Sequence, residues 1–155
     1  MRRVVRPFLL VLLVVFVGIQ FVPVSRSSPP VDQAQTVERK VAVPAEVSGI
    51  LNRACKDCHS DETVWPAYSY VAPASWFLAW HVNKAREEMN LSEWGGYDSD
   101  AARDILLEVC RQVKKGAMPV ASYTLIHRSA ALSPADVQTL CAWTDATRKA
   151  LRAAE

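Results

Sequence analysis

Two cysteines and a histidine within five positions are the residues of this sequence best suited to chemistry. Cys55, Cys58 and His59 form the pattern Cys-x-x-Cys-His, which is the attachment signature of c-type haem. Two thiols at this spacing on a helical turn can each add to one vinyl group of a haem, and the histidine that follows can ligate the iron. We therefore expect one covalent haem c, with His59 as an iron ligand.

The same residues are compatible with three other kinds of site. A thioredoxin-like dithiol normally follows a strand and opens a helix, whereas this cysteine pair closes a helix and no βαβ pattern surrounds it. A zinc site would need a fourth ligand, such as Cys110. A plain disulfide between Cys55 and Cys58 is the remaining alternative. The sequence favours haem over all three and leaves them open.

Met118 is the residue that we expect on the opposite side of the iron. It lies in the stretch Gly-Ala-Met-Pro, where Pro119 restricts the loop, and a soft thioether suits a low-spin haem with a raised reduction potential. His81 and His127 are rival ligands, and an open or water-bound position is a further alternative. The expected metal ligands are thus His59 and Met118.

Aromatic residues are dense around these segments. Their rings can pack against a porphyrin over a large area, and the indole N–H or phenol O–H groups can reach its propionates. The same residues also suit an ordinary core, so none is assigned to a propionate. They are Trp65, Tyr68, Tyr70, Trp76, Trp80 and Tyr123.

Four helices are expected to position the site. Apolar residues recur at helical spacing in each, and no segment shows convincing strand alternation, so the expected fold class is all-α. The connections between the helices are too long for an ordinary bundle. We expect a small cytochrome c-like domain packed around the haem. The four segments are approximately 45–57, 74–90, 98–115 and 133–151.

Local signals mark the helix ends and two inward-facing cysteines. Ser133 is the expected N-cap of the last helix, Pro134 occupies its first position, and Gly116 ends the helix before it. Cys110 and Cys141 fall on the inner faces of these two helices. They either form a disulfide or remain two small buried apolar residues.

An apolar run occupies residues 8–22, after Arg2, Arg3 and Arg6. Fifteen helical residues span roughly 22 Å, and the flanking valines with snorkelling arginines extend this toward the ~30 Å of a bilayer core. We expect an uncleaved transmembrane helix, with a cleaved export signal as the alternative. The arginines would stay in the cytoplasm. This places the chain in the bacterial inner membrane as a single-pass protein, with its C-terminal domain in the periplasm or outside.

The chain divides into three expected segments. Residues 1–24 are the membrane anchor or signal, residues 25–43 are a Pro-rich linker without helical or strand period, and residues 44–155 are the haem-binding, cytochrome c-like domain. We expect the N-terminal helix to attach this domain to the membrane.

The charge balance excludes nucleic acid as a partner. The full chain carries a net charge of +2, but after its first six residues fifteen Lys and Arg face sixteen Asp and Glu. Binding to nucleic acid depends on a basic patch that releases counterions, and the domain shows none.

Several stretches of the chain resemble a known family. They are Cys55 to Trp76 (CKDCHSDETVWPAYSYVAPASW), Leu91 to Trp94, Gly116 to His127 (GAMPVASYTLIH), Leu132-Ser133 and the exit IQFVP of the N-terminal segment. Together they resemble the bacterial haem-binding-domain family, whose members look like membrane-anchored, single-haem c-type proteins. The resemblance implies haem attachment by Cys55 and Cys58 and ligation by His59, and Met118 matches the Met-Pro position of the family.

These observations predict an electron carrier rather than a catalyst. A His/Met-ligated mono-haem cytochrome would carry single electrons between redox partner proteins of a respiratory or other electron-transfer chain. The alternative is a haem enzyme or sensor, peroxidase-like or gas-binding, with an open or displaceable sixth position. His81 and Arg86 are its only local support, and five positions along one helix do not direct two side chains to the same spot.

Overall fold

The computed structural model describes residues 2–154, and within this range the chain is all-helical and contains no strand. The all-α part of the predicted fold class is therefore confirmed. The longer helices are α1 (Arg2–Ile19), α3 (Ala45–Ala54), α5 (Ala74–Glu88), α6 (Ser99–Lys114) and α8 (Pro134–Ala153). The short ones are α2 (Val37–Lys40), α4 (Lys56–His59) and α7 (Ala121–Thr124), with 3₁₀ turns η1 (Gln33–Gln35), η2 (Ala67–Tyr70), η3 (Leu91–Gly96) and η4 (Arg128–Ala130).

The four helices predicted in the domain are all present. The first of them is divided, because the backbone of Cys55 leaves the helical region with φ −125° and so separates α3 from α4. The other three are α5, α6 and α8. Sequence periodicity missed α2, α7 and the 3₁₀ turns, since three or four residues do not complete a recognisable apolar repeat.

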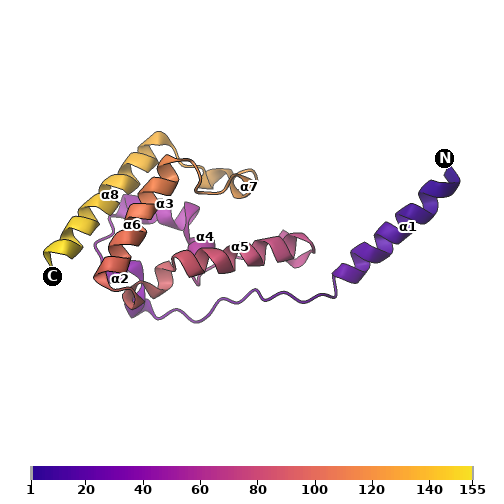
Figure 1. The fold of residues 1–155 in the computed structure, drawn as a ribbon, viewed down its shortest axis with the longest axis horizontal. Coiled ribbons are helices and arrows are strands. Elements are labelled where there is room, and N and C mark those ends of the chain that lie inside the picture. The colour runs from indigo at the N-terminus through magenta and orange to yellow at the C-terminus, as the bar shows by residue number, and fades with distance from the viewer. Residues whose placement is uncertain (1, 155) are drawn as a thin grey trace.

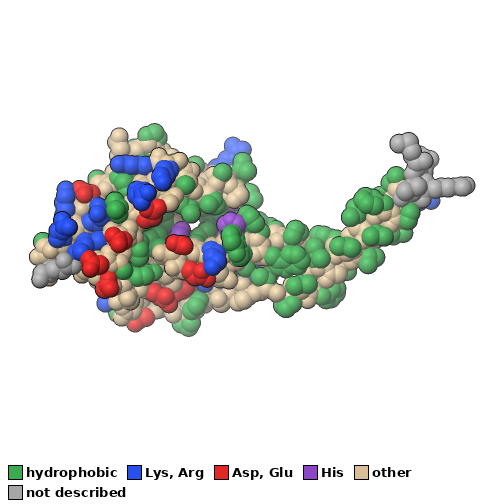
Figure 2. All heavy atoms as spheres, in the orientation of Figure 1, with side chains coloured by type: hydrophobic (Ala, Val, Ile, Leu, Met, Phe, Trp, Pro, Cys, Tyr) green, Lys and Arg blue, Asp and Glu red, His purple; other side chains and the backbone are tan. Residues whose placement is uncertain are grey.

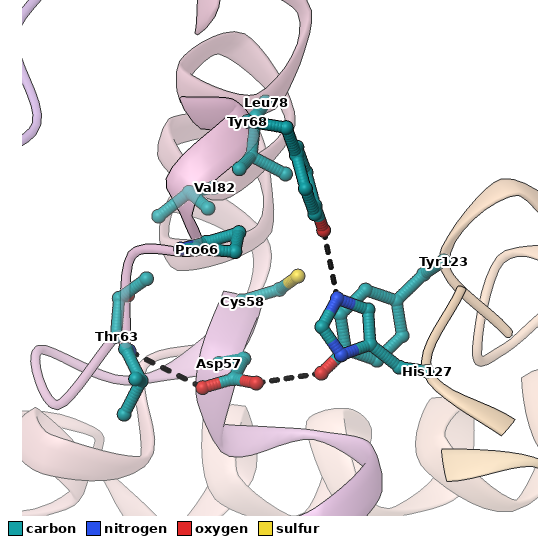
Figure 3. A pocket seen from close by; sticks show the side chains of 10 residues that line it. Asp57, Cys58, Thr63, Pro66, Tyr68, Leu78, Val82, Tyr123 and His127 are labelled. Atoms are coloured by element: carbon teal, nitrogen blue, oxygen red, sulfur yellow. Dashed lines mark hydrogen bonds between the residues drawn. The ribbon is translucent and has the colours of Figure 1, made fainter. Parts of the chain in front are cut away.

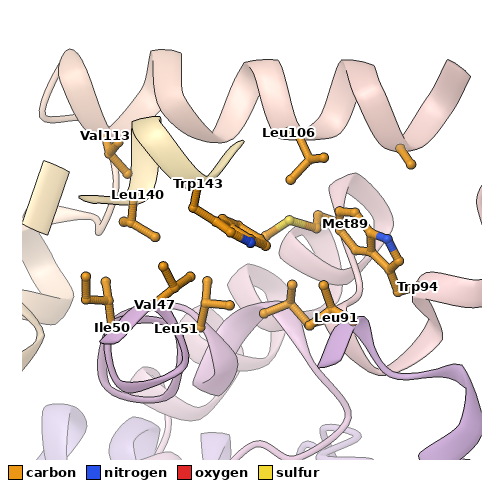
Figure 4. Packing of buried hydrophobic residues seen from close by; sticks show 12 residues of the cluster. Val47, Ile50, Leu51, Met89, Leu91, Trp94, Leu106, Val113, Leu140 and Trp143 are labelled. Atoms are coloured by element: carbon orange, nitrogen blue, oxygen red, sulfur yellow. The ribbon is translucent and has the colours of Figure 1, made fainter. Parts of the chain in front are cut away.

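The core lies where α6 and α8 pack together and α3 and η3 close over them (Figure 4). A disulfide between Cys110 and Cys141 joins the two long helices, with their Cα atoms 4.9 Å apart. This settles one alternative left open by the sequence. The largest side chains that are completely buried are Leu51, Leu91, Leu106 and Leu140.

Side-chain caps fix the ends of α6 and α8. At the N-terminus of α6, the Asp98 carboxylate accepts from the backbone N–H of Ala101 at 2.8 Å. Just beyond the C-terminus of α6, Gly116 adopts a left-handed φ of +67°. At α8, the Ser133 hydroxyl accepts from the backbone N–H of Asp136, whose carboxylate accepts from the backbone N–H of Ser133. The predicted cap at Ser133 is confirmed and forms a capping box.

The N-terminal helix requires a correction. Among residues 2–154, no helix is both long enough and apolar enough to cross a membrane. The 18 residues of α1 rise only about 27 Å, short of the ~30 Å core of a bilayer, and they include Arg2, Arg3 and Arg6. The predicted transmembrane helix, and with it the predicted single-pass anchoring in the bacterial inner membrane, is therefore wrong. Figures 1 and 2 show α1 projecting from the domain with its apolar side chains exposed.

The segment between α1 and α3 follows the surface of the domain and hydrogen-bonds to it. The Gln20 side-chain amide pairs with both backbone groups of Ala72, accepting from its N–H at 2.9 Å and donating to its carbonyl at 3.2 Å. Arg26 donates to the carbonyl of Ser69 and lies over the ring of Tyr70. Val37, in α2, is completely buried in the core.

The arrangement of α4, α5 and α7 forms the surroundings of the Cys-x-x-Cys-His motif. α4 packs between α3 and α5, and α5 packs mainly against α4 and η2. α7 packs mainly against η4, the turn that follows it. Figure 1 shows α5 and α7 extending on the same side of the α6–α8 pair.

Candidate haem site

The attachment motif forms one tight turn. The carbonyl of Cys55 accepts from the backbone N–H of Cys58 at 3.1 Å and from that of His59 at 2.9 Å. Both thiols and the imidazole are thereby held on a single short helix, α4, and its entry residue. This is the local geometry that the spacing of the motif predicted.

Both thiols of the motif are free and protonated at neutral pH. Burial, with a smaller contribution from Cys58, raises the pKa of Cys55 to about 12. Burial and then the charge of Asp57 raise the pKa of Cys58 to about 11. Redox-active dithiols depend on a lowered thiol pKa, so the environment here is the opposite of the one that a thioredoxin-like site needs.

Cys110, the fourth ligand suggested for a zinc site, is not available in the structure. Cys110 is bonded to Cys141 and is therefore not a thiolate that could join Cys55, Cys58 and His59. Across the described part of the chain, no three or more His, Cys, Asp or Glu side chains are grouped so as to hold a metal ion.

His59 is oriented by the C-terminal end of α5. Its Nδ1 donates to the carbonyl of Ala85 at 2.9 Å and to that of Met89 at 3.2 Å. Burial lowers the pKa of His59, so the ring is neutral at pH 7. A neutral imidazole whose Nδ1 carries the hydrogen has its lone pair on Nε2, which is the form that binds a metal. The lone pair on Nε2 of His59 is therefore available to a metal.

A buried ionic network fixes the loop after the motif. Arg86 donates from Nε to the carbonyl of Ser60 at 2.8 Å and from another nitrogen to Thr63 Oγ1 at 2.9 Å. It also lies 3.4 Å from the carboxylate of Asp61, and both side chains are almost entirely buried. Asn90 donates to the second oxygen of that carboxylate at 3.1 Å. The end of α5 thus holds both His59 and the residues that follow it.

A small hollow of about 10 Å³ lies over Cys58. Figure 3 shows the sulfur of Cys58 pointing into this hollow, toward the pair formed by Tyr68 and His127. The hydroxyl of Tyr68 and Nε2 of His127 form a hydrogen bond at 2.7 Å, and the hydroxyl of Tyr123 donates to the carboxylate of Asp57 at 2.6 Å. Burial, followed by the hydrogen bond to Asp57, raises the pKa of Tyr123 well above its usual range, so that it remains a donor.

The three candidates for the sixth ligand differ in their surroundings. Met118 is 38% exposed on the loop between α6 and α7. Nε2 of His127 is engaged in a hydrogen bond with the hydroxyl of Tyr68. His81 donates from Nδ1 to the carbonyl of Phe77 at 2.9 Å, which leaves the lone pair of Nε2 in the neutral ring. Thioether and imidazole donors therefore remain at Met118 and His81.

Exposed apolar side chains in the segments that form the hollow provide a test of whether haem fits. The hollow itself, at about 10 Å³, is far smaller than the usual ~300–1,000 Å³ of a ligand pocket. Val64 lines it and is 75% exposed, and Leu125 and Ile126, between Tyr123 and His127, are 76% and 64% exposed. Phe77 and Trp80 of α5 are also mostly exposed. Two free thiols, an oriented imidazole and this apolar surface are the features that a covalent haem requires.

Sequence reasoning missed the residues that position the motif. Asp57 stands at one of the two variable positions of Cys-x-x-Cys-His and carried no signal of its own. Tyr123 and His127 are four apart, a spacing that places them on one helical face, and this was the only available sign of their joint role. Arg86 was considered only as a partner of His81, whereas the structure directs it to Asp61.

Comparison with known proteins identifies the family. The sequence profile of the family described as "Haem-binding domain" matches residues 14–146, which is most of the chain. No curated protein and no solved structure matches it. The match includes the attachment turn, the C-terminal end of α5 and the loop that carries Met118. The chain therefore belongs to the haem-binding-domain family.

Proposed function

We propose that this protein is a single-haem c-type cytochrome that passes one electron at a time between redox partner proteins. One observation carries the proposal: the attachment turn offers two free thiols and an imidazole already oriented by two carbonyls. A bound haem supplies an iron that alternates between the ferric and ferrous states.

Cys55 and Cys58 would hold the haem through two thioether bonds. Each thiol adds its sulfur to one carbon of a vinyl double bond and its hydrogen to the other, so the addition consumes no oxidant and releases no group. The protonated state of both thiols is consistent with this balance.

His59 and Met118 are the proposed axial ligands. His59 would bind through Nε2, since Nδ1 is engaged by the carbonyls of Ala85 and Met89. The thioether of Met118 is a soft ligand that raises the reduction potential. With His59 and Met118 both bound to it, the iron would have no position left for a substrate, which favours electron transfer over catalysis.

A peroxidase-like function has less support. It would use a distal base together with a polarising cation, and the only candidates near each other in the sequence are His81 and Arg86. Arg86 is committed to Asp61, the carbonyl of Ser60 and Thr63. The cation that such chemistry needs is thus occupied in holding the loop after the motif.

The attachment can be tested by mass and by haem staining of a denaturing gel. Full-length protein, matured with a c-type haem-attachment system, should gain the mass of one haem and stain after denaturation. The Cys55→Ala/Cys58→Ala variant should lose both signals. The matched control is Cys110→Ala/Cys141→Ala, which removes the other two cysteines and should keep the haem. A wild-type protein with the mass of its amino acids alone would refute the proposal.

Met118→Ala tests the axial assignment. The ferric wild-type protein should show the charge-transfer band of methionine bound to haem iron, and the variant should lose it while keeping covalent haem. Met89→Leu is the control, because Met89 is buried in the core and this exchange conserves volume. Persistence of the band in Met118→Ala would exclude Met118. Carbon monoxide binding to ferrous wild type without a ligand-exchange delay would instead favour the enzyme or sensor.

A further inference from the structure

The segment 117–127, which carries Met118 and α7, is weakly tied to the hydrophobic core. Its helix packs mainly against η4, which is its own continuation. Met118, Leu125 and Ile126 are exposed. Segments with little burial belong to the least stable part of a fold. Some other contact must therefore determine where this segment lies relative to the attachment turn.

Two tyrosine hydrogen bonds supply that contact. Tyr123 donates to Asp57 Oδ2 at 2.6 Å, and the Tyr68 hydroxyl forms a hydrogen bond with His127 Nε2 at 2.7 Å. The rings of Tyr123 and His127 stack with centroids 4.3 Å apart and planes inclined by 16°. We call these four residues the tyrosine clasp. Figure 3 shows Tyr123 and His127 coming from one segment and meeting Asp57 and Tyr68 across the hollow.

The clasp joins the segment to both sides of the attachment site. Asp57 lies between Cys55 and Cys58 in the motif, and its other oxygen accepts from the backbone N–H of Val64 at 3.3 Å. Tyr68 belongs to η2, which packs against α5, the helix that orients His59. The bond from Tyr123 therefore joins the segment to α4, the helix of the attachment motif. The bond between His127 and Tyr68 joins it to η2, which packs against the helix that orients His59.

We propose that the tyrosine clasp positions Met118 for ligation by holding segment 117–127 against the attachment turn. The inference rests on the proposed function, because it concerns the sixth ligand of the same haem. Asp57, Tyr68, Tyr123 and His127 are positioning residues that act through the segment rather than on the iron.

The chemistry of the clasp explains why it would control ligand exchange. A hydrogen bond to a charged carboxylate stabilises a contact more than one between neutral groups. Its loss would increase the fraction of time that the segment stands away from the attachment turn by roughly ten- to a hundredfold. An external ligand can bind the iron only while Met118 is displaced, so its binding rate reports that fraction directly.

The test compares Tyr123→Phe with wild type in the covalently loaded, full-length protein. This change removes the hydroxyl and keeps the ring that stacks on His127. We expect cyanide to bind the ferric protein, and carbon monoxide the ferrous protein, at least about tenfold faster than in wild type. The methionine charge-transfer band should weaken in parallel. Tyr70→Phe is the matched control, since it makes the same change on an exposed ring of η2 outside the clasp.

Substitutions of Asp57, which accepts the hydrogen bond from Tyr123, distinguish a positioning role from a general loss of folding. Asp57→Asn keeps an oxygen that can accept from Tyr123 but loses the charge, so its rates should rise less than those of Tyr123→Phe, whereas Asp57→Leu should behave like Tyr123→Phe. If Tyr123→Phe does not accumulate, Tyr68→Phe removes the second bond of the clasp and has the same expected result.

The outcomes distinguish this inference from the proposed function. Absence of covalent haem, or of the methionine band, from wild type would refute the proposed function and the inference together. A wild type with both signals, combined with wild-type exchange rates in loaded Tyr123→Phe or in loaded Tyr68→Phe, would refute the clasp alone.

Discussion

The imidazole of His59 depends for its direction on groups that the sequence places far away. Its Nδ1–H donates to the carbonyls of Ala85 and Met89. The loop that follows His59 is held by Arg86, which donates to the carbonyl of Ser60. The carboxylate of Asp61 beside this guanidinium is only 6% exposed. A buried ion pair of this kind is costly to break from one side, because the remaining charge is left without a partner.

Arg86→Ala should therefore destabilise the protein strongly. We expect the free energy of unfolding to fall by about 3 kcal/mol, because Asp61 would remain buried without its cation. Denaturant unfolding of the haem-loaded protein measures this loss. Lys84→Ala is the comparison, since it breaks an exposed pair with Glu87 on the same helix and should change stability little. Equal effects of the two variants would contradict a special role for the buried pair.

Residues of the site were predictable only where the chemistry is local in sequence. Cys55, Cys58 and His59 are adjacent, so a motif reveals them. Asp57 and Tyr123 are 66 residues apart, and Tyr68 and His127 are 59 apart. A pair of polar side chains at such separations leaves no spacing pattern, because only the folded packing of α4, η2 and α7 brings them together.

At the scale of the element, helix ends were the most predictable feature. Ser133 and Pro134 combine an N-cap side chain with a fixed φ, and α8 begins where they predicted. The break at Cys55 was not predictable from periodicity, since the apolar repeat runs through it. α7 has only four residues, too few for a repeat.

Ser133→Ala tests the capping box of α8. The loss of the cap should lower the free energy of unfolding by about 1 kcal/mol. Ser133→Thr keeps a hydroxyl and should therefore retain most of the stability that the cap contributes. Denaturant titration at neutral pH measures both variants, and equal losses in the two would show that the hydroxyl bond is not what stabilises α8.

The capping box also predicts a dependence on pH. The backbone N–H and then the hydroxyl of Ser133 hold the pKa of Asp136 below its ordinary value. A lowered folded-state pKa contributes stability above the unfolded pKa of about 3.9, and this contribution is lost as pH falls through the folded pKa. The difference between wild type and Ser133→Ala should therefore shrink below about pH 4. A constant difference from pH 7 to pH 3 would contradict the carboxylate's part in the cap.

At the scale of the whole molecule, the all-α class was predictable because four segments carry clear apolar periodicity. The course of the N-terminal segment was not. Prolines and the absence of a period made residues 25–43 read as a linker, while Val37 is fully buried in the core. A single valine in a short helix gives no pattern, and its burial depends on η3 being folded against α2.

The disulfide between Cys110 and Cys141 should contribute to global stability. It closes a loop over a separation of 31 residues, for which the chain-entropy relation gives about 3–4 kcal/mol. Cys110→Ser/Cys141→Ser should unfold at correspondingly lower denaturant concentration, and wild type treated with a thiol reductant should approach the variant. A variant that unfolds together with oxidised wild type would show that the bond adds nothing.

The burial of Val37 has a practical consequence for anyone who wishes to shorten this protein. A fragment that starts at residue 44 would lack this valine and its contact with η3. In the same fragment, the indole of Trp143 would lose the carbonyl of Ala42, to which it donates at 2.9 Å. Arg86 would lose the carbonyl of Ser27 in the same cut. Spectroscopic or crystallographic work on a trimmed form should therefore keep the chain from Gln20 onward.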